Sequence, residues 1–382
     1  MENWRLIDLG MAEPYVAQCF YEAVALAVDR GLSPSTIILV QPSSPYVCLG
    51  YHQVLEKEID IEYCRERGLP IIRRSQGGGA VYLNSDQIFY QVVASEDSKV
   101  IPRKVDELFE KLLQVTVYVY RELGLNAEFK PLNDVMVNNR KISGNGAGRI
   151  GKAIILVGNI ILDLDYDSMA RVLKIPDEKF RDKMAKSMRE WVTSIRRELG
   201  YIPPVDEIKK LLVEGYEKIL GIKLIPSDPS EDEMSIFERE VKPKHMSYEW
   251  LHMPELTHKG LTIDRAVKIA DGIKVIEVAH KARKLIKVTA EVIGDKILDI
   301  MITGDFFMVP EDGVSKIEAA LKGMILNREE IAKKIREVFE KHDIQSPGIS
   351  AEDFADAIMR LKEYTEKYPP EVRPFAEPEK KD

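Results

Sequence analysis

The sequence predicts an α/β fold followed by a smaller α+β domain. Helical and strand-like segments alternate up to residue 221, and a strand meander followed by helices occupies residues 273–368. Between them, residues 223–258 carry four prolines and mixed charges, which is typical of an inter-domain connection. A length of 382 residues also favours two domains. We therefore expect domains at 1–245 and 246–368, and a disordered, proline-rich tail at 369–382.

In the first domain, apolar residues at helical spacing predict helices, and short apolar runs between turn residues predict strands. A first helix begins near residue 11 and ends at Gly31, and a long one at 104–124 ends at Gly124. Two further helices are expected at 59–70 and 206–221. The expected strands lie at 35–41, 46–52, 71–74, 80–84, 87–95 and 152–165, and the continuous apolar run of the last suggests a sheet centre.

In the second domain, alternating residues at 273–307 predict an antiparallel meander with one turn at Gly294-Asp295. Two helices are expected at 313–323 and 327–342. The stretch "SAED" at 350–353 predicts the start of a third helix, because a serine N-cap followed by an acidic third residue forms a capping box.

Composition and charge exclude several classes of protein. The 55 basic and 63 acidic residues give a net charge of −8, which disfavours a nucleic-acid binder. No apolar run is long enough to cross a membrane, and the N-terminus lacks a signal pattern. Three cysteines without metal spacing fit a reducing cytoplasm. The six scattered histidines predict no protein-bound catalytic metal.

The stretch "IIRRSQGGGAVYLN" at residues 71–84 is the first candidate site. Consecutive glycines cost backbone entropy, so they indicate either a tight hairpin or a ligand lying against bare backbone. The stretch is neither a P-loop nor a dinucleotide fingerprint, because no Gly-Lys-Ser/Thr and no helix follow the glycines. Arg73 and Arg74 end a strand, so one of them should face the concave side of the sheet. A guanidinium beside free backbone amides favours an anion site.

The stretch "NDVMVNNRKISGNGAGR" at residues 133–149 is the second candidate. It predicts two strands around Asn138-Asn139, a pair that tolerates positive φ. Lys141 then lies on a strand beside a flexible glycine-rich loop that could close over a ligand, or it is simply a solvated lysine. The cationic segment 179–195 reads as a solvated helix face unless it folds over the same pocket.

Taken together, these stretches resemble the lipoate–protein ligases, a superfamily shared with biotin ligases and octanoyltransferases. "RRSQGGGAV" is similar to the family pattern R-R-x-[ST]-G-G-G-A-V, with Gln76 in place of the usual hydroxyl residue. "NDVMVNNRKISG" resembles its lysine hairpin, "DKMAKSMREWVTSI" its adenylate-covering segment and "GDFF" its accessory domain. The sequence departs from the family at Leu83-Asn84, where His-Asp is common, and in the "GNGAG" loop.

The resemblance implies a mixed sheet flanked by helices, as in biotin ligase and class II aminoacyl-tRNA synthetase catalytic domains, with a small α+β domain appended. It implies that lipoate or octanoate is activated by ATP and Mg²⁺ and transferred to a lysine of lipoyl-domain acceptors. Such acceptors are 2-oxoacid dehydrogenase E2 subunits and the glycine cleavage H protein. Lys141 is the implied catalytic residue, and Asp134 could help hold Mg²⁺. The residues implied to bind ATP or lipoyl-AMP are Arg74, Gly77, Gly78, Gly79, Ala80, Val81, Tyr82, Asn133, Asp134, Lys141, Ser143, Gly144 and Lys183.

Three alternatives remain open at this point. An ATP-independent octanoyl or lipoyl transferase needs a nucleophilic cysteine near the lysine loop, but no cysteine follows Cys64. A biotin ligase fits "KPLNDV" but lacks that family's Gly-Arg-Gly-x-x-Gly-Arg loop. A non-catalytic binding module would bind the acyl group without pyrophosphate exchange. The sequence does not separate lipoate from octanoate.

Overall fold

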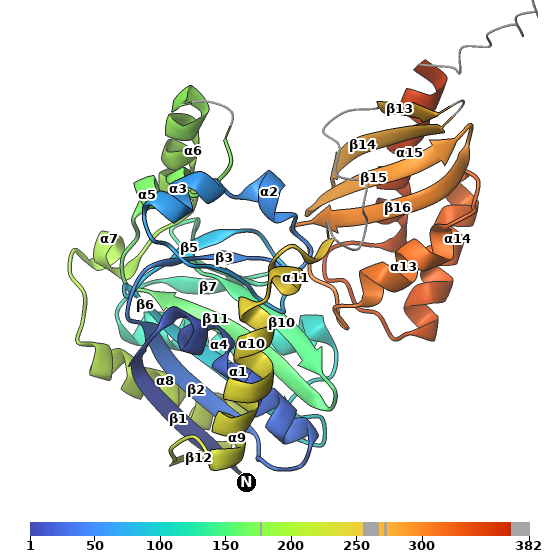
Figure 1. Ribbon diagram of the computed structural model, residues 1–382. Coiled ribbons are helices and arrows are strands. Elements are labelled where there is room, and N and C mark those ends of the chain that lie inside the picture. Colours follow the sequence, from blue (N-terminus) through green and yellow to red (C-terminus); the bar gives the residue numbers. More distant parts are fainter. Residues whose placement is uncertain (176–177, 255–266, 271–272, 368–382) are drawn as a thin grey trace, which may run out of the picture.

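The structure is a computed structural model that describes residues 1–175, 178–254, 267–270 and 273–367 (Figure 1). A six-stranded sheet forms the centre of the larger domain, in the order β10-β11-β6-β2-β1-β12. β1 pairs in parallel with β2 and β12, whereas β2, β6, β11 and β10 pair antiparallel, so the expected mixed sheet is confirmed. The strands are β1 (Glu2–Ala12), β2 (Thr36–Pro42), β6 (Gln87–Ser95), β10 (Asn145–Ile150), β11 (Ala153–Ile161) and β12 (Ile222–Pro226).

Helices cover both faces of this sheet, as the alternation of side chains in β2 requires. Ile37 and Leu39 pack into the core that α4 (Val105–Glu122) and α8 (Val205–Leu220) share. Ile38 and Val40 pack on the opposite face against α1 (Pro14–Asp29). Because every residue of β2 is buried, the strand reads as one continuous apolar run.

Two three-stranded sheets carry the candidate site stretches. One has the order β4-β3-β5 and the other β7-β8-β9. Short helices lie around them, α6 carrying the cationic segment. The elements are β3 (Tyr46–Leu49), β4 (Ile71–Arg73), β5 (Val81–Leu83), β7 (Ala127–Lys130), β8 (Asp134–Val137), β9 (Arg140–Ser143), α2 (Leu55–Glu58), α3 (Ile61–Glu66), α5 (Tyr166–Arg171), α6 (Glu178–Trp191) and α7 (Ile195–Leu199).

The glycine stretch is not a tight hairpin. β4 pairs in parallel with one edge of β3, and β5 pairs antiparallel with the other edge. Residues 74–80 therefore cross from one side of β3 to the other. Of the two explanations offered for the consecutive glycines, the hairpin is excluded.

The loop expected at "GNGAG" is also different in the structure. Residues 145–150 form β10, an edge strand that pairs with β11 from Asn145–Gly158 to Ile150–Ala153. Backbone pairing with β11 satisfies the amides and carbonyls that a flexible loop would leave to water. The glycine-rich segment after Lys141 is therefore an edge strand rather than the loop that one reading of the sequence suggested. The Asn138-Asn139 turn is confirmed, with φ values of 50° and 61°.

The described part of the expected connection, residues 223–254, is mostly helical. After β12 it forms α9 (Glu231–Ile236), the π-helix η1 (Phe237–Val241), α10 (Lys242–Met246) and α11 (Tyr248–Leu251). Phe237 packs on Phe20 of α1, with ring centroids 5.6 Å apart. This helical segment therefore belongs to the core of the larger domain, because the buried apolar face of η1 outweighs the proline signal. Residues 255–258 lie outside the described residues.

The C-terminal part is an antiparallel sheet, β13-β14-β15-β16, packed against three helices (Figure 1). The expected meander, the Gly294 turn and the Ser350 capping box with Asp353 are confirmed. This part has its own apolar core, and we keep the division near residue 245 as a proposal. The predicted tail at 369–382 lies outside the described residues. The elements are β13 (Val267–Ala270), β14 (Ile273–Lys281), β15 (Leu285–Ile293), β16 (Lys296–Gly304), α13 (Gly313–Leu321), α14 (Arg328–Lys341) and α15 (Ala351–Lys367).

None of the described helices combines the length and the apolar character that a membrane span requires.

Candidate functional site

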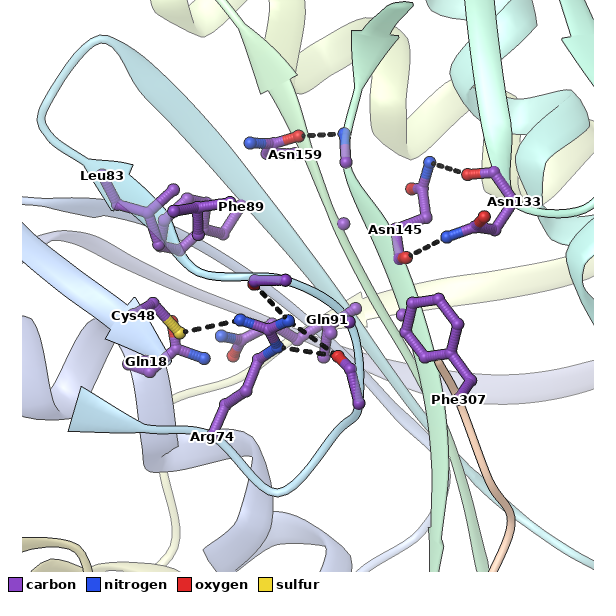
Figure 2. Close-up of a pocket in the computed structure, with 18 of the residues that line it drawn as sticks. Gln18, Cys48, Arg74, Leu83, Phe89, Gln91, Asn133, Asn145, Asn159 and Phe307 are labelled. Carbon is purple, nitrogen blue, oxygen red and sulfur yellow. Dashed lines mark hydrogen bonds between the residues drawn. The ribbon is translucent and has the colours of Figure 1, made fainter. Parts of the chain in front are cut away.

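A cavity of about 200 Å³ lies where the two candidate stretches meet the C-terminal part (Figure 2). Its walls come from α1, β3, β5, β6, β9, β10 and β11, together with the glycine loop, Asn133, Gly144 and two residues of the C-terminal part. The lining residues are Gln18, Cys48, Arg74, Gly77, Gly78, Gly79, Val81, Leu83, Phe89, Gln91, Asn133, Lys141, Gly144, Asn145, Gly146, Val157, Gly158, Asn159, Lys284 and Phe307.

Arg74 is the member of the arginine pair that reaches this cavity (Figure 2). Its Nη2 donates to the carbonyls of Gly77 and Gly79 at 2.7 and 2.9 Å, so the guanidinium shapes the glycine loop around itself. Gly78, between them, has φ +97°, a conformation that favours glycine. The loop thus places backbone and a cation on the same wall, as an anion site requires.

Arg73 has a structural role instead. Its side chain is fully buried and donates to the carbonyls of Gly50, Tyr51, Gln53, Trp250 and Leu251. Burial lowers the pKa of its guanidinium to about 10. Because α11 supplies two of these carbonyls, Arg73 fixes the helical segment to the strand that ends at the glycine loop.

Lys141 lies on β9 and lines the cavity. Its ammonium pairs with the carboxylate of Asp134 at 2.6 Å, which orients the side chain. The segment that follows α6 is held to this strand, because the Thr193 amide donates to the Lys141 carbonyl at 2.8 Å. The lysine is therefore positioned on a rigid strand, with about one third of its side chain exposed.

Asn133 and Asn145 join the lysine hairpin to β10. The Asn133 side chain donates to the Asn145 carbonyl at 2.7 Å, and the Asn145 side chain donates to the Asn133 carbonyl at 3.0 Å (Figure 2). Asn159 accepts from the Gly144 amide at 2.7 Å. These paired amides hold the cavity wall in place of the loop that the sequence suggested.

Most of the predicted site residues line this cavity, and a few do not. Ser143 is buried behind the wall, where its hydroxyl donates to the Asn159 carbonyl at 2.8 Å. Lys183 lies on an exposed face of α6, over the ring of Phe180. Those outside the lining are Ala80, Tyr82, Asp134, Ser143 and Lys183.

Several lining residues had no individual signal in the sequence. Phe89 and Gln91 lie on the same face of β6 and line the cavity. Their spacing of two residues predicts a shared face, but which face meets the cavity follows only from the orientation of the strand. Gln18 comes from α1 and accepts from the buried Tyr46 hydroxyl at 2.8 Å. Lys284 and Phe307 are more than 130 residues from Lys141 in the chain, so only tertiary packing brings them to the cavity.

All three cysteines are buried. Of the three, Cys48 belongs to the described cavity lining. Its thiol accepts from Arg74 Nη1 at 3.4 Å. Burial raises the pKa of this thiol in spite of the nearby guanidinium, so it is held as a thiol at neutral pH. A protonated, buried thiol is a poor nucleophile.

Asp134 was also considered as a Mg²⁺ ligand. Its carboxylate is already paired with Lys141, and the described residues contain no group of three side chains able to hold a metal ion. The residues therefore do not fit a protein-held magnesium site. A single carboxylate could at most assist an ion that substrate phosphates carry.

Comparisons with known families agree with this two-part architecture. The family described as lipoyl protein ligase A/B catalytic domain matches residues 13–217. The family described as bacterial lipoate protein ligase C-terminus matches residues 285–358.

Curated relatives carry two kinds of names. An octanoyltransferase of Moorella thermoacetica is 29% identical over 65% of this chain and 98% of its own length. Subunit 1 of lipoate-protein ligase A from Thermoplasma acidophilum is 32% identical over 53% of this chain and 79% of its own length.

Solved structures share the fold. The bipartite lipoate protein ligase of T. acidophilum, studied with its E2 lipoyl domain, is 29% identical with a TM-score of 0.58, covering 66% of this chain and 97% of that one. A lipoate-protein ligase A bound with ATP is 26% identical with a TM-score of 0.56, covering 66% and 99%. A Plasmodium falciparum protein in complex with lipoate is 12% identical with a TM-score of 0.63, covering 94% and 99%, which shows the fold alone. With the catalytic-domain match extending over more than half of its residues, this chain belongs to the lipoyl protein ligase A/B family.

Proposed function

We propose that the protein is an ATP-dependent ligase that activates lipoate or octanoate as the acyl-adenylate and transfers the acyl group to a lysine of a lipoyl-domain acceptor. The observation that carries the proposal is the C-terminal part, which matches a lipoate ligase C-terminus and places Lys284 and Phe307 in the cavity wall. The match to the octanoyltransferase covers 65% of this chain and 98% of that relative. The relative therefore has no counterpart to the remaining third of this chain.

In the first half-reaction, a carboxylate oxygen of the acid attacks the α-phosphorus of ATP and pyrophosphate leaves. Both reactants are anionic, so cations are needed to bring them together. Arg74 and Lys141 lie in the same cavity wall and supply that charge. The backbone of Gly77, Gly78 and Gly79 lines the cavity beside Arg74, so in this proposal it lies against the phosphate and adenylate.

In the second half-reaction, the acceptor lysine nitrogen attacks the acyl carbonyl carbon, AMP leaves and the nitrogen loses a proton. Lys141 polarises the carbonyl while Asp134 holds the ammonium in place. Asn133, Ser143 and Gly144 support the wall, and Lys183 belongs to a helix that covers the adenylate. Any Mg²⁺ arrives with the nucleotide. The apolar side chains of Leu83, Phe89 and Val157 face the acyl chain.

The second candidate is an ATP-independent octanoyl or lipoyl transferase, and the names of several relatives favour it. That route needs a thiolate that takes the acyl group as a thioester. Cys48 is the thiol that the described cavity lining offers, and burial raises its pKa. The geometry therefore supports adenylation over thioester chemistry.

The deciding experiment measures lipoate-dependent ATP–pyrophosphate exchange, with octanoate and biotin as competitors. We expect exchange with lipoate or octanoate and none with biotin. Cys48→Ser should keep exchange and transfer near wild type, as should Cys64→Ser, a buried control outside the cavity lining. If wild type shows no exchange but transfers octanoyl groups from an acyl-carrier donor, and Cys48→Ser abolishes that transfer, the ligase proposal fails.

A further inference from the structure

Lys284 is a charged residue in the cavity wall that the mechanism above does not use. It lies in the turn between β14 and β15, next to Leu285, and reaches the cavity from the C-terminal part. Its ammonium lies 5.5 Å from the ring centroid of Phe307, another lining residue. Among the residues that the structure describes, Lys284 has no ion-pair partner.

The turn that carries Lys284 is held in place on both sides. The Leu285 amide donates to the Asp305 carboxylate, and the Asp305 amide donates to the Leu285 carbonyl at 3.2 Å. The adjacent Gly304 amide donates to the His52 carbonyl of the larger domain at 3.1 Å. Asp305 thus fixes the turn at the point where the two parts of the molecule meet, so Lys284 is presented by a rigid element.

The charge of the cavity wall is unbalanced. Its charged lining residues are Arg74, Lys141 and Lys284, and the described lining contains no acidic side chain. Asp134, behind the wall, neutralises one of the three charges through its pair with Lys141. Asp305 also attracts Lys284, but it is paired with Lys281 at 3.8 Å. Desolvation, followed by repulsion from Lys141, lowers the pKa of Lys284. A bound anion with more than one negative charge would offset both the desolvation of Lys284 and its repulsion from Lys141.

We propose that Lys284 is an anion-binding residue for the polyphosphate of ATP, so that the C-terminal part completes the nucleotide site. The inference rests on the proposed function. A polyphosphate fits better than the acid's carboxylate, because two positive charges remain after Asp134 is counted and a carboxylate carries only one negative charge. An ammonium acts as a point charge on phosphate oxygens and needs no fixed planar geometry.

The test compares the KM for ATP and for lipoate in pyrophosphate exchange between wild type, Lys284→Met and Lys284→Arg. Losing one charge-assisted contact should raise the KM for ATP about tenfold to a hundredfold, while the KM for lipoate changes by less than about twofold. Lys284→Arg, which keeps the charge, should lie between the two. Lys281→Met is the matched control, because Lys281 is an exposed lysine at the end of β14, beside the turn, and pairs with Asp305 at 3.8 Å.

An unchanged KM for ATP in folded Lys284→Met, or a rise confined to the KM for lipoate, would overturn the inference. If Lys284→Met does not fold, as judged by circular dichroism, Lys284→Gln takes its place. If wild type itself shows no exchange, the proposed function fails separately. Lys284 is then judged by calorimetric binding of inorganic pyrophosphate, which should be weaker in the uncharged variant than in wild type and equal in both if the inference is wrong.

Discussion

The two glycine-rich segments at 77–79 and 144–148 look alike in the sequence but differ in the structure. The first is an irregular crossing between β4 and β5 and includes Gly78 at φ +97°. The second is mostly the regular strand β10, and none of its glycines has positive φ. Turn geometry therefore explains glycine at 78 but not at 146 or 148.

What the two segments share is contact with the C-terminal part. A Cβ on Gly77 would lie 2.1 Å from the Phe306 carbonyl oxygen, and one on Gly148 would lie 2.5 Å from Glu311 Oε1. Gly79, in contrast, has no atom within 4 Å of such a Cβ although it lines the cavity. Glycine thus serves two purposes here: close packing of the second domain at most positions, and open backbone toward the cavity at Gly79.

The largest expected effect concerns the cation that precedes the second segment. Lys141→Ala should lower pyrophosphate exchange, and transfer from preformed lipoyl-AMP, by on the order of 10²–10³, because a preorganised donor to developing charge is lost. Steady-state rates of the two half-reactions measure this. Lys141→Arg should also be impaired, because a planar guanidinium does not replace a point charge between two oxygens.

Arg140→Ala is the control for that change. Arg140 is adjacent in the chain but pairs with Glu198 at 2.6 Å, so its loss should lower thermal stability and leave the ratio of the half-reactions unchanged. Near wild-type rates in Lys141→Ala together with inactive Arg140→Ala would show that the assigned cation is wrong.

Gly77→Val should give the next largest effect, since it tests the packing role of the first segment. The clash is with backbone atoms of Phe306 and Phe307, which cannot rotate away. Overpacking of about 1–3 kcal/mol should separate the two parts and lower exchange about tenfold to a hundredfold. Limited proteolysis should then cleave the full-length protein faster than in wild type. Unchanged activity and unchanged proteolysis would remove the packing explanation.

A pH effect should follow from Glu311, which packs beside Gly148 in the second segment. Burial raises its pKa to about 8, from an ordinary value of 4.5. Between these values the folded chain keeps a proton that the unfolded chain has lost, so this carboxyl lowers stability progressively as pH rises from about 4.5 to about 8.

Glu311→Gln should abolish that trend. At pH 8.5 it should melt at least about 2–4 °C above wild type, the shift expected for about 1 kcal/mol in a domain of 150–250 residues. The two proteins should converge near pH 4.5. Glu330→Gln, an exposed residue in the first turn of α14, is the control and should follow the wild-type pH profile. Parallel melting curves for wild type and Glu311→Gln across this range would contradict the prediction.

Gly79→Ala should change stability least among these variants. It tests whether the backbone at Gly79 is left open for a ligand. With free space for the methyl group, unfolding should change by less than about 0.5 kcal/mol. If a ligand lies against this backbone, the KM for ATP or lipoate should rise several-fold without any loss of stability. A variant that matches wild type in both KM values would mean that no ligand contacts Gly79.

Much of both domains could be predicted because the information is local. Helix ends follow from Gly31 and Gly124, the hairpin turn from Asn138-Asn139, and the cap of the last helix from Ser350 and Asp353. The strand β1 was missed because its burial depends on parallel pairing with β2 and β12, and β12 is about 220 residues away. Parallel pairs have no short-range turn signal.

At the site, the sequence alone determined the kinds of residues: a cation beside glycines, a lysine on a hairpin and an asparagine-aspartate pair. The family resemblance implied Arg74, but the residue pattern alone left the two arginines equivalent. Only the tertiary structure supplies the reason, because β4 turns Arg73 toward backbone carbonyls and leaves Arg74 at the loop. It also decided that "GNGAG" is a strand and that Lys284 and Phe307 join the wall. The physical reason is that side-chain type is a local property, whereas burial and the balance of charge around a cavity depend on segments that meet only after the chain has folded.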